Sequence, residues 1–150
     1  MHGVPLRPSG AATRHSGSFA LCEPTLVDRP PAGSGWFHEV KHGGFRVLAR
    51  KQRERILLWS RRGADFTDRF SRIAEAVRGL NADDALIDGE AVVFQDDGRS
   101  DFHALLTKRG WTEAAFVAFD LLRLNGDDLR QHPLEKRREA LMRRITSNMR

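Results

Sequence analysis

The sequence predicts an α+β fold with an antiparallel sheet. Short apolar strand patterns dominate the middle of the chain, and polar turns separate them, as is typical of antiparallel neighbours. Apolar side chains recur at helical spacing between residues 67 and 80, and Pro133 stands where helices commonly begin. The length of 150 residues fits one compact domain.

The expected elements follow one another in a definite order. A Pro/Gly-rich stretch at 30–35 predicts a surface loop, and Asn125-Gly126 predicts a tight turn that closes a strand. The expected strands are 36–40, 45–49, 56–60, 85–94 and 116–124, the first three forming a meander. The expected helices are 67–80, a short one at 102–106, and a strongly basic one after Pro133 with Leu134, Leu141 and Ile145 on one face.

The composition limits the classes of protein to which this chain can belong. With 40% hydrophobic and 30% charged residues the chain is globular, although the start at 1–18, rich in Pro, Gly and Ser, is expected to be a disordered leader. Cys22 is the only cysteine, which excludes an intrachain disulfide and fits a reducing cytoplasm. No stretch approaches the roughly 18 apolar residues that span a bilayer, so no membrane partner is expected. The net charge of +5 suits phosphate contacts, but a GC-rich genome explains an arginine bias equally well.

The first candidate for chemistry is the segment Glu39-Val40-Lys41-His42-Gly43-Gly44-Phe45-Arg46. A lysine before a Gly-Gly turn presents its amine above a backbone that a ligand can approach closely, and Arg46 can neutralise phosphate. Such an amine can act as a nucleophile. An exposed turn lysine without a chemical role has the same local pattern, so this segment alone leaves both interpretations open.

Three further segments place charge or an aromatic ring beside apolar residues. Asp88 and Glu90 flank a glycine inside an apolar strand, where carboxylates need a cation such as Mg²⁺ or, alternatively, arginine partners. Phe119 at the end of a buried strand can stack on a base or belong to the core. Arg61 in Ser60-Arg61-Arg62-Gly63 suits a phosphate or ribose clamp, and an ordinary surface equally.

Taken in order, these segments resemble the motifs of the adenylation domain of ATP-dependent DNA ligases, most closely the bacterial ligase D type. Glu39 to Arg46 resembles the first motif, Lys-x-Asp-Gly-x-Arg. The later motifs are matched by Ser60-Arg61-Arg62-Gly63, Leu86-Ile87-Asp88-Gly89-Glu90-Ala91 and Phe119-Asp120-Leu121-Leu122. The resemblance covers roughly Phe19 to Ile145 and implies an antiparallel-sheet nucleotidyltransferase fold, similar to ATP-grasp.

The resemblance also implies a role for each motif residue. Lys41 would attack the α-phosphate of ATP and hold AMP as a lysyl phosphoramidate, which would pass to a DNA 5′-phosphate before the nick is sealed in repair or recombination. The other implied ATP-binding residues are Glu39 at the adenine amino group, Arg46 and Arg61 at ribose and phosphate, Glu90 at ribose or Mg²⁺, and Phe119 on the base. Nicked or broken DNA, end-joining proteins and a bacterial cytoplasm, close to the nucleoid, are the implied partners and location.

The sequence departs from the family pattern in two places. Gly43 stands where the first motif has aspartate, and the phosphate-binding lysines of later family motifs have no counterpart after Asp120. We therefore expect residues 19–150 to be a partial adenylation domain, incomplete at its C-terminus, without the OB-fold domain and with little or no activity. The alternatives are a non-catalytic ATP- or DNA-binding remnant and a subunit completed by a second ligase chain. An RNA ligase or capping-type enzyme shares the lysine chemistry, but the flanking segments favour ligase D.

Overall fold

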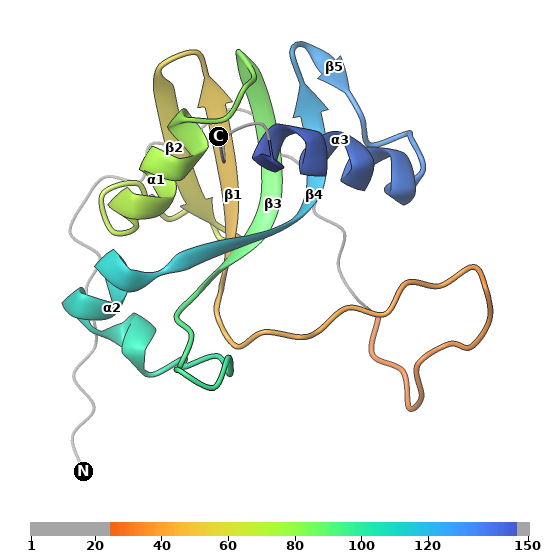
Figure 1. Cartoon of the computed structure of the whole chain (residues 1–150), viewed down its shortest axis with the longest axis horizontal. Coiled ribbons are helices and arrows are strands. Elements are labelled where there is room, and N and C mark those ends of the chain that lie inside the picture. The colour runs from red at the N-terminus through yellow and green to blue at the C-terminus, as the bar shows by residue number, and fades with distance from the viewer. Residues whose placement is uncertain (1–24, 147–150) are drawn as a thin grey trace.

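Five strands of the computed structural model, which describes residues 25–146, form one antiparallel sheet in the order β2-β1-β3-β4-β5 (Figure 1). The strands are β1 Phe45–Gln52, β2 Arg55–Ser60, β3 Asp84–Val92, β4 Ala115–Leu124 and β5 Asp127–Asp128. The helices are α1 Ser71–Arg78, the short 3₁₀ helix η1 Ala104–Leu106, α2 Lys108–Glu113 and α3 Leu134–Thr146. The α+β fold with an antiparallel sheet is thus confirmed.

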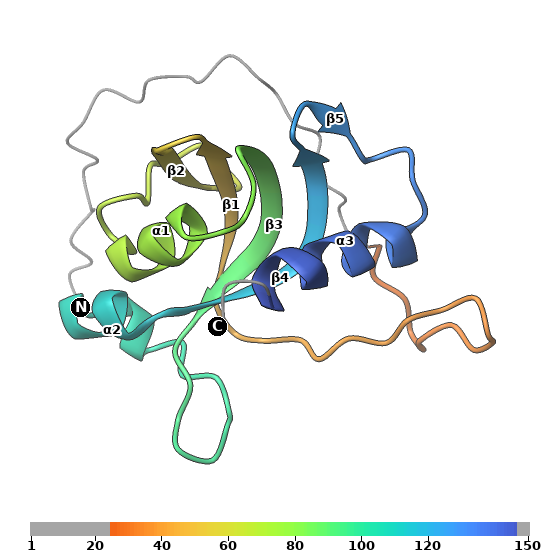
Figure 2. The same cartoon turned by 45° about the horizontal axis from the view of Figure 1, so that its top comes forward.

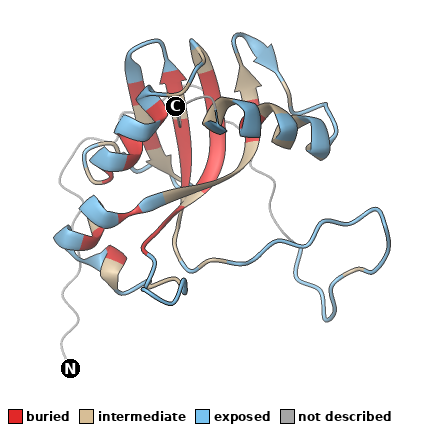
Figure 3. Ribbon diagram, viewed as in Figure 1, coloured by how far each residue is buried: buried red, intermediate tan, exposed pale blue. Residues whose placement is uncertain are grey.

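Helices α1 and α3 cover the same face of the sheet (Figure 2). The helical period places Ile73 and Val77 of α1 and Leu141 of α3 inward, where they are buried with strand residues such as Val47 and Ile87. Burying each of these side chains stabilises the fold by about 1.5–3 kcal/mol. The buried residues concentrate in the central strands β1 and β3 (Figure 3). An apolar cavity of about 230 Å³ remains on this face between α1 and α3.

The predicted Asn125-Gly126 turn is confirmed. Both residues have positive φ angles, 47° and 99°, as a two-residue hairpin between right-twisted strands requires. The Asn125 side-chain oxygen also accepts hydrogen bonds from the backbone amides of Asp83 and Asp84, at 3.0 and 3.2 Å. The turn between β4 and β5 is therefore tied to the beginning of β3.

Several expected elements differ from the structure. Residues 36–40 form no strand, so the expected meander is reduced to the β1–β2 hairpin, and Trp36 and Val40 remain 59% and 78% exposed. Helix α1 is shorter than 67–80: residues 67–70 form turns, and the Thr67 hydroxyl oxygen is held at β2, where it accepts a hydrogen bond from the Leu58 amide. Helix α2 was not expected. Its start is capped by Thr107, whose hydroxyl oxygen accepts from the Gly110 amide.

The leader expected at 1–18 lies outside the described residues. None of the described helices is long and apolar enough to cross a membrane.

Candidate functional site

Strand alternation places the motif residues of β1 and β3 on the sheet face that α1 and α3 leave uncovered. Since Val47 and Ile87 enter the helix-covered core, their neighbours Arg46 and Asp88 point to the opposite face. Across the two strands, Arg46 lies opposite Glu90. The apolar part of the uncovered face is formed by Leu48, Leu86, Leu122 and Trp59. The candidate site therefore lies at the end of this face where β1 begins and β3 ends.

Arg46 joins the carboxylate of β3 to the aromatic ring of β4. Its Nε and Nη2 donate to the two Asp88 carboxylate oxygens at 3.0 and 2.6 Å, and Asp88 is only 3% exposed. A bidentate pair of this kind satisfies a buried carboxylate. The same guanidinium lies 5.8 Å from the centre of the Phe119 ring, within cation–π range. Of the two alternatives considered for Asp88, the structure shows the arginine partner.

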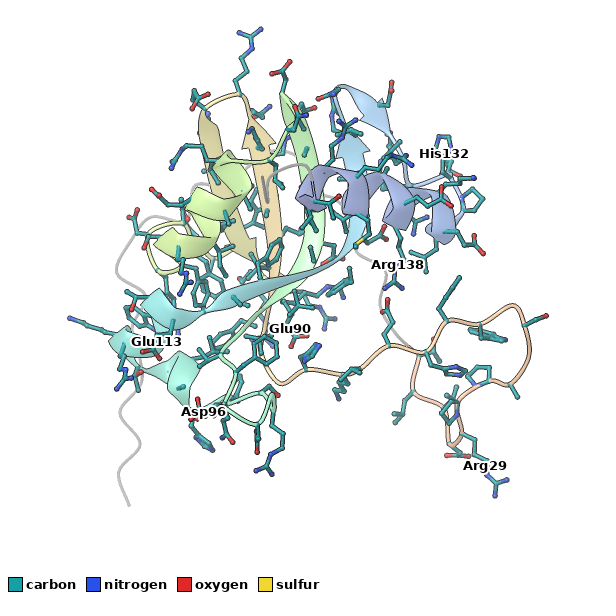
Figure 4. The ribbon with its side chains drawn as sticks, viewed as in Figure 1. Arg29, Glu90, Asp96, Glu113, His132 and Arg138 are labelled. Atoms are coloured by element: carbon teal, nitrogen blue, oxygen red, sulfur yellow. The ribbon has the colours of Figure 1, made fainter. Side chains whose placement is uncertain are left out.

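Glu90 lies beside the segment that carries Lys41 (Figure 4). Partial burial raises the pKa of its carboxyl group, and this effect is opposed by a hydrogen bond from the Gly44 amide and by the positive charges of His42, Lys41 and Arg46. Because of this close approach, a Cβ atom on Gly44 would lie 2.9 Å from Glu90 Cγ. Glu90 is thus a partly desolvated carboxylate among cations.

Replacing Glu90 by glutamine is expected to stabilise the chain at pH 7 and to flatten its pH dependence. The folded state raises the pKa of Glu90, so it binds the proton more tightly than the unfolded state does, and stability falls as pH rises above the ordinary range of a glutamate. Thermal unfolding from pH 4 to 8 measures this slope. Glu54→Gln, an exposed position in the β1–β2 turn, is the control and should leave the slope unchanged.

The structure also places the three other residues predicted to react with or bind ATP. Lys41 is exposed in the extended segment that leads into β1. Arg61 follows β2, whose last residue, Ser60, pairs with Val47, so Arg61 comes at the end of the sheet where Arg46 lies. Glu39 instead forms an ion pair with Arg138 of α3, which reaches toward the extended segment (Figure 4). The structure therefore brings together Lys41, Arg46, Glu90 and Phe119, and it engages Glu39 elsewhere.

Sequence reasoning missed the role of α3 at this site. Arg137 donates to both carboxylate oxygens of Asp120, at 2.7 and 2.8 Å, and so ties α3 to the strand residue after Phe119. The sequence predicts a strongly basic helix here. The spacing of its arginines along the sequence does not indicate which acidic side chain each arginine contacts.

The donor set at the site fits a metal ion that arrives with a nucleotide. Among residues 25–146 no group of three or more His, Cys, Asp or Glu side chains gathers as a metal site. Asp88 is engaged by Arg46, whereas Glu90 lies near the phosphate-binding side chains expected here. Mg²⁺ is commonly held by one or two carboxylates together with substrate phosphates. Glu90 can supply one such carboxylate.

Comparison with known proteins identifies relatives of this chain. Residues 27–150 match the family model described as ATP dependent DNA ligase domain. The multifunctional non-homologous end joining protein LigD of Pseudomonas aeruginosa is 38% identical over 120 residues, which are 78% of this chain and 14% of that protein. DNA ligase C of Mycobacterium tuberculosis is 32% identical over 130 residues, covering 79% of this chain and 35% of that protein.

Solved structures agree with these relatives. The ligase domain of M. tuberculosis LigD superposes with a TM-score of 0.62 and 30% identity, over 73% of this chain and 36% of that chain. A mycobacterial DNA ligase D complexed with ATP and MES gives a TM-score of 0.60 at 30% identity, over 70% and 35%. The chain thus spans 14% to 36% of the length of these four relatives. It belongs to the ATP-dependent DNA ligase domain family.

Proposed function

We propose that this chain binds ATP and accepts AMP on Lys41, as the nucleotide-transfer part of an ATP-dependent DNA ligase. One observation carries the proposal: Glu90 and Phe119, which come much later in the sequence, lie with Lys41 and Arg46 of the first motif at one end of the uncovered sheet face. Together they offer a nucleophile, a cation, a carboxylate and an aromatic ring. The ATP complex of a mycobacterial ligase D with this fold supports ATP as the nucleotide.

In the proposed reaction, the Lys41 amine loses a proton to solvent and its lone pair attacks the α-phosphorus of ATP. A P–N bond forms while the P–O bond to pyrophosphate breaks, and pyrophosphate leaves. Phe119 stacks on the adenine, and Arg46 and Arg61 face ribose and phosphates. Mg²⁺, held by Glu90 and the phosphates, would offset the charge that develops on the phosphate oxygens. Glu39 would reach the adenine amino group only after releasing Arg138.

The later steps belong to the same proposal. AMP would pass to the 5′-phosphate of a DNA nick, and a 3′-hydroxyl would displace it. DNA with nicks or ends is then the substrate, end-joining proteins are the partners, and the bacterial cytoplasm, close to the nucleoid, is the location. The net charge of +5 supports contact with a DNA backbone.

A second candidate is a nucleotide-binding subunit completed by another ligase chain. Exposed apolar side chains in the segment before Lys41 favour it, since such side chains commonly find cover in an interface: Leu26, Trp36, Phe37 and Val40 are all more than half exposed. In this case covalent AMP should appear only when a chain carrying the remaining family motifs is added.

Replacing Phe119 by alanine is expected to weaken ATP binding about tenfold, since stacking of a base on an aromatic ring is worth about 1–3 kcal/mol. Calorimetric titration of the full chain with ATP and Mg²⁺ measures the affinity, and circular dichroism checks that the variant is folded. Met142→Ala, at an exposed position of α3 on the helix-covered side of the sheet, is the control and should bind like the wild type. Unchanged affinity in Phe119→Ala, or no ATP binding by the wild type, contradicts the proposed function.

A further inference from the structure

The segment that follows Lys41 is held by a separate loop, residues 94–102, here called the clamp loop. The rings of His42 and Phe94 are nearly perpendicular, with their centres 5.6 Å apart. The Gly43 amide donates a hydrogen bond of 3.0 Å to Ser100 Oγ. The rings of Phe45 and Phe102 lie 5.3 Å apart. Three contacts in close succession therefore join the clamp loop to the backbone next to Lys41.

The clamp loop is braced by its own hydrogen bonds. Phe94 and Ser100 form an antiparallel bridge, and the backbone amides of Gln95 and Asp101 donate to Arg99 and Val93, both at 2.8 Å. Asp96 marks this loop in Figure 4. Internal bonds of this kind allow the loop to hold the Ser100 hydroxyl in one place without help from a ligand.

Arg69 anchors the same cluster to the helices. Its guanidinium lies 5.0 Å from the centre of the Phe45 ring and 4.7 Å from that of Trp111, and it donates to the Leu105 carbonyl at 3.0 Å. The Phe45–Phe102 contact is thus continuous with α2 and with the turn before α1. The end of the clamp loop at Phe102 is therefore packed against the rest of the fold.

We propose that Ser100 is a positioning residue for the Lys41 nucleophile, because its hydroxyl fixes the Gly43 amide and so the direction in which Lys41 leaves the backbone. This inference rests on the proposed function. Gly43 has no side chain, so its backbone is the only part of the residue that can be held. A Cβ atom there would meet Ser100 Oγ at 3.4 Å, which places the hydroxyl directly over this position. Misplacement of a nucleophile by about 1 Å can cost on the order of 100-fold in rate.

The test compares Ser100→Ala and Ser100→Thr in the full chain. In Ser100→Ala the Gly43 amide is expected to exchange with solvent about tenfold faster, and AMP transfer to Lys41 at saturating ATP to slow about tenfold, with the ATP dissociation constant unchanged. Ser100→Thr keeps the hydroxyl and should restore both quantities. Amide exchange is read by NMR, AMP transfer by label from the α-phosphate of ATP in a single turnover, and affinity by calorimetry. Ser71→Ala, at an exposed serine that is the first residue of α1, is the matched control.

Each outcome decides one of the two proposals. Unchanged Gly43 exchange in Ser100→Ala overturns the inference, and so does a slowed transfer that threonine fails to restore while the melting temperature stays that of the wild type. An equal loss in ATP affinity and in rate would assign Ser100 to nucleotide binding instead and also overturns it. A wild-type chain that binds no ATP contradicts the proposed function alone, and Gly43 exchange then decides the inference by itself.

Discussion

Replacing Lys41 by alanine is expected to remove covalent AMP from the chain completely while leaving ATP affinity within about twofold of the wild type. The ε-amine is the proposed nucleophile, so no other group can substitute for it. Lys41 is exposed, and truncation of an exposed side chain changes stability by less than about 0.5 kcal/mol. The measurement is incubation with Mg²⁺ and ATP labelled at the α-phosphate, followed by a denaturing gel.

A sensitive label and long exposures allow even a weak wild-type signal to be measured. Lys108→Ala removes another exposed lysine, at the start of α2, and should retain the wild-type signal. A signal that persists in Lys41→Ala, or one lost equally in both variants, contradicts the assignment of Lys41 as nucleophile.

Replacing Gly44 by alanine is expected to destabilise the fold by about 3 kcal/mol. The added Cβ would lie 2.3 Å from the Ala91 carbonyl oxygen, an atom of the β3 backbone. Relief of this clash requires β1 and β3 to move apart where Phe45 pairs with Ala91, next to Glu90. Urea unfolding followed by circular dichroism gives the change in free energy.

Gly43→Ala is the matched control, because it adds the same methyl group one residue earlier. There the Cβ would lie 3.4 Å from Ser100 Oγ, an ordinary contact, so the free energy of unfolding should change by less than about 1 kcal/mol. Equal destabilisation by the two substitutions would show that the close packing of Gly44 on β3 is not what makes glycine necessary there.

Local patterns predicted most of the fold. Short apolar segments between polar turns identified β1 to β4, and the helical period identified α1 and α3. Residues 36–40 also suit a strand but form none, because a strand needs a neighbour to take its backbone hydrogen bonds and none of the described strands lies beside them. Residue types therefore predict the tendency to be a strand, while pairing decides the outcome.

Residue types likewise indicated which side chains can carry chemistry, but not where these side chains lie in the fold. The sequence has only four lysines, of which Lys41 lies in the first motif, yet Lys51 is the buried one. Its amine donates to backbone carbonyls at the end of α1, including that of Leu80 at 2.8 Å. Sequence spacing does not separate an exposed nucleophile from a buried lysine that stabilises a helix end. The difference lies in which segment packs over each side chain.

The sequence by itself determined the fold class, the ligase family and the residues that carry its motifs, because these depend on residue type and order along the chain. Only the tertiary structure decided which residues contact each other: Arg46 pairs with Asp88, Glu39 pairs with Arg138, and Ser100 accepts a hydrogen bond from Gly43. These pairs join residues 42, 99 and 57 positions apart. Contacts at such separations arise from strand order, register and loop closure, which no local pattern encodes.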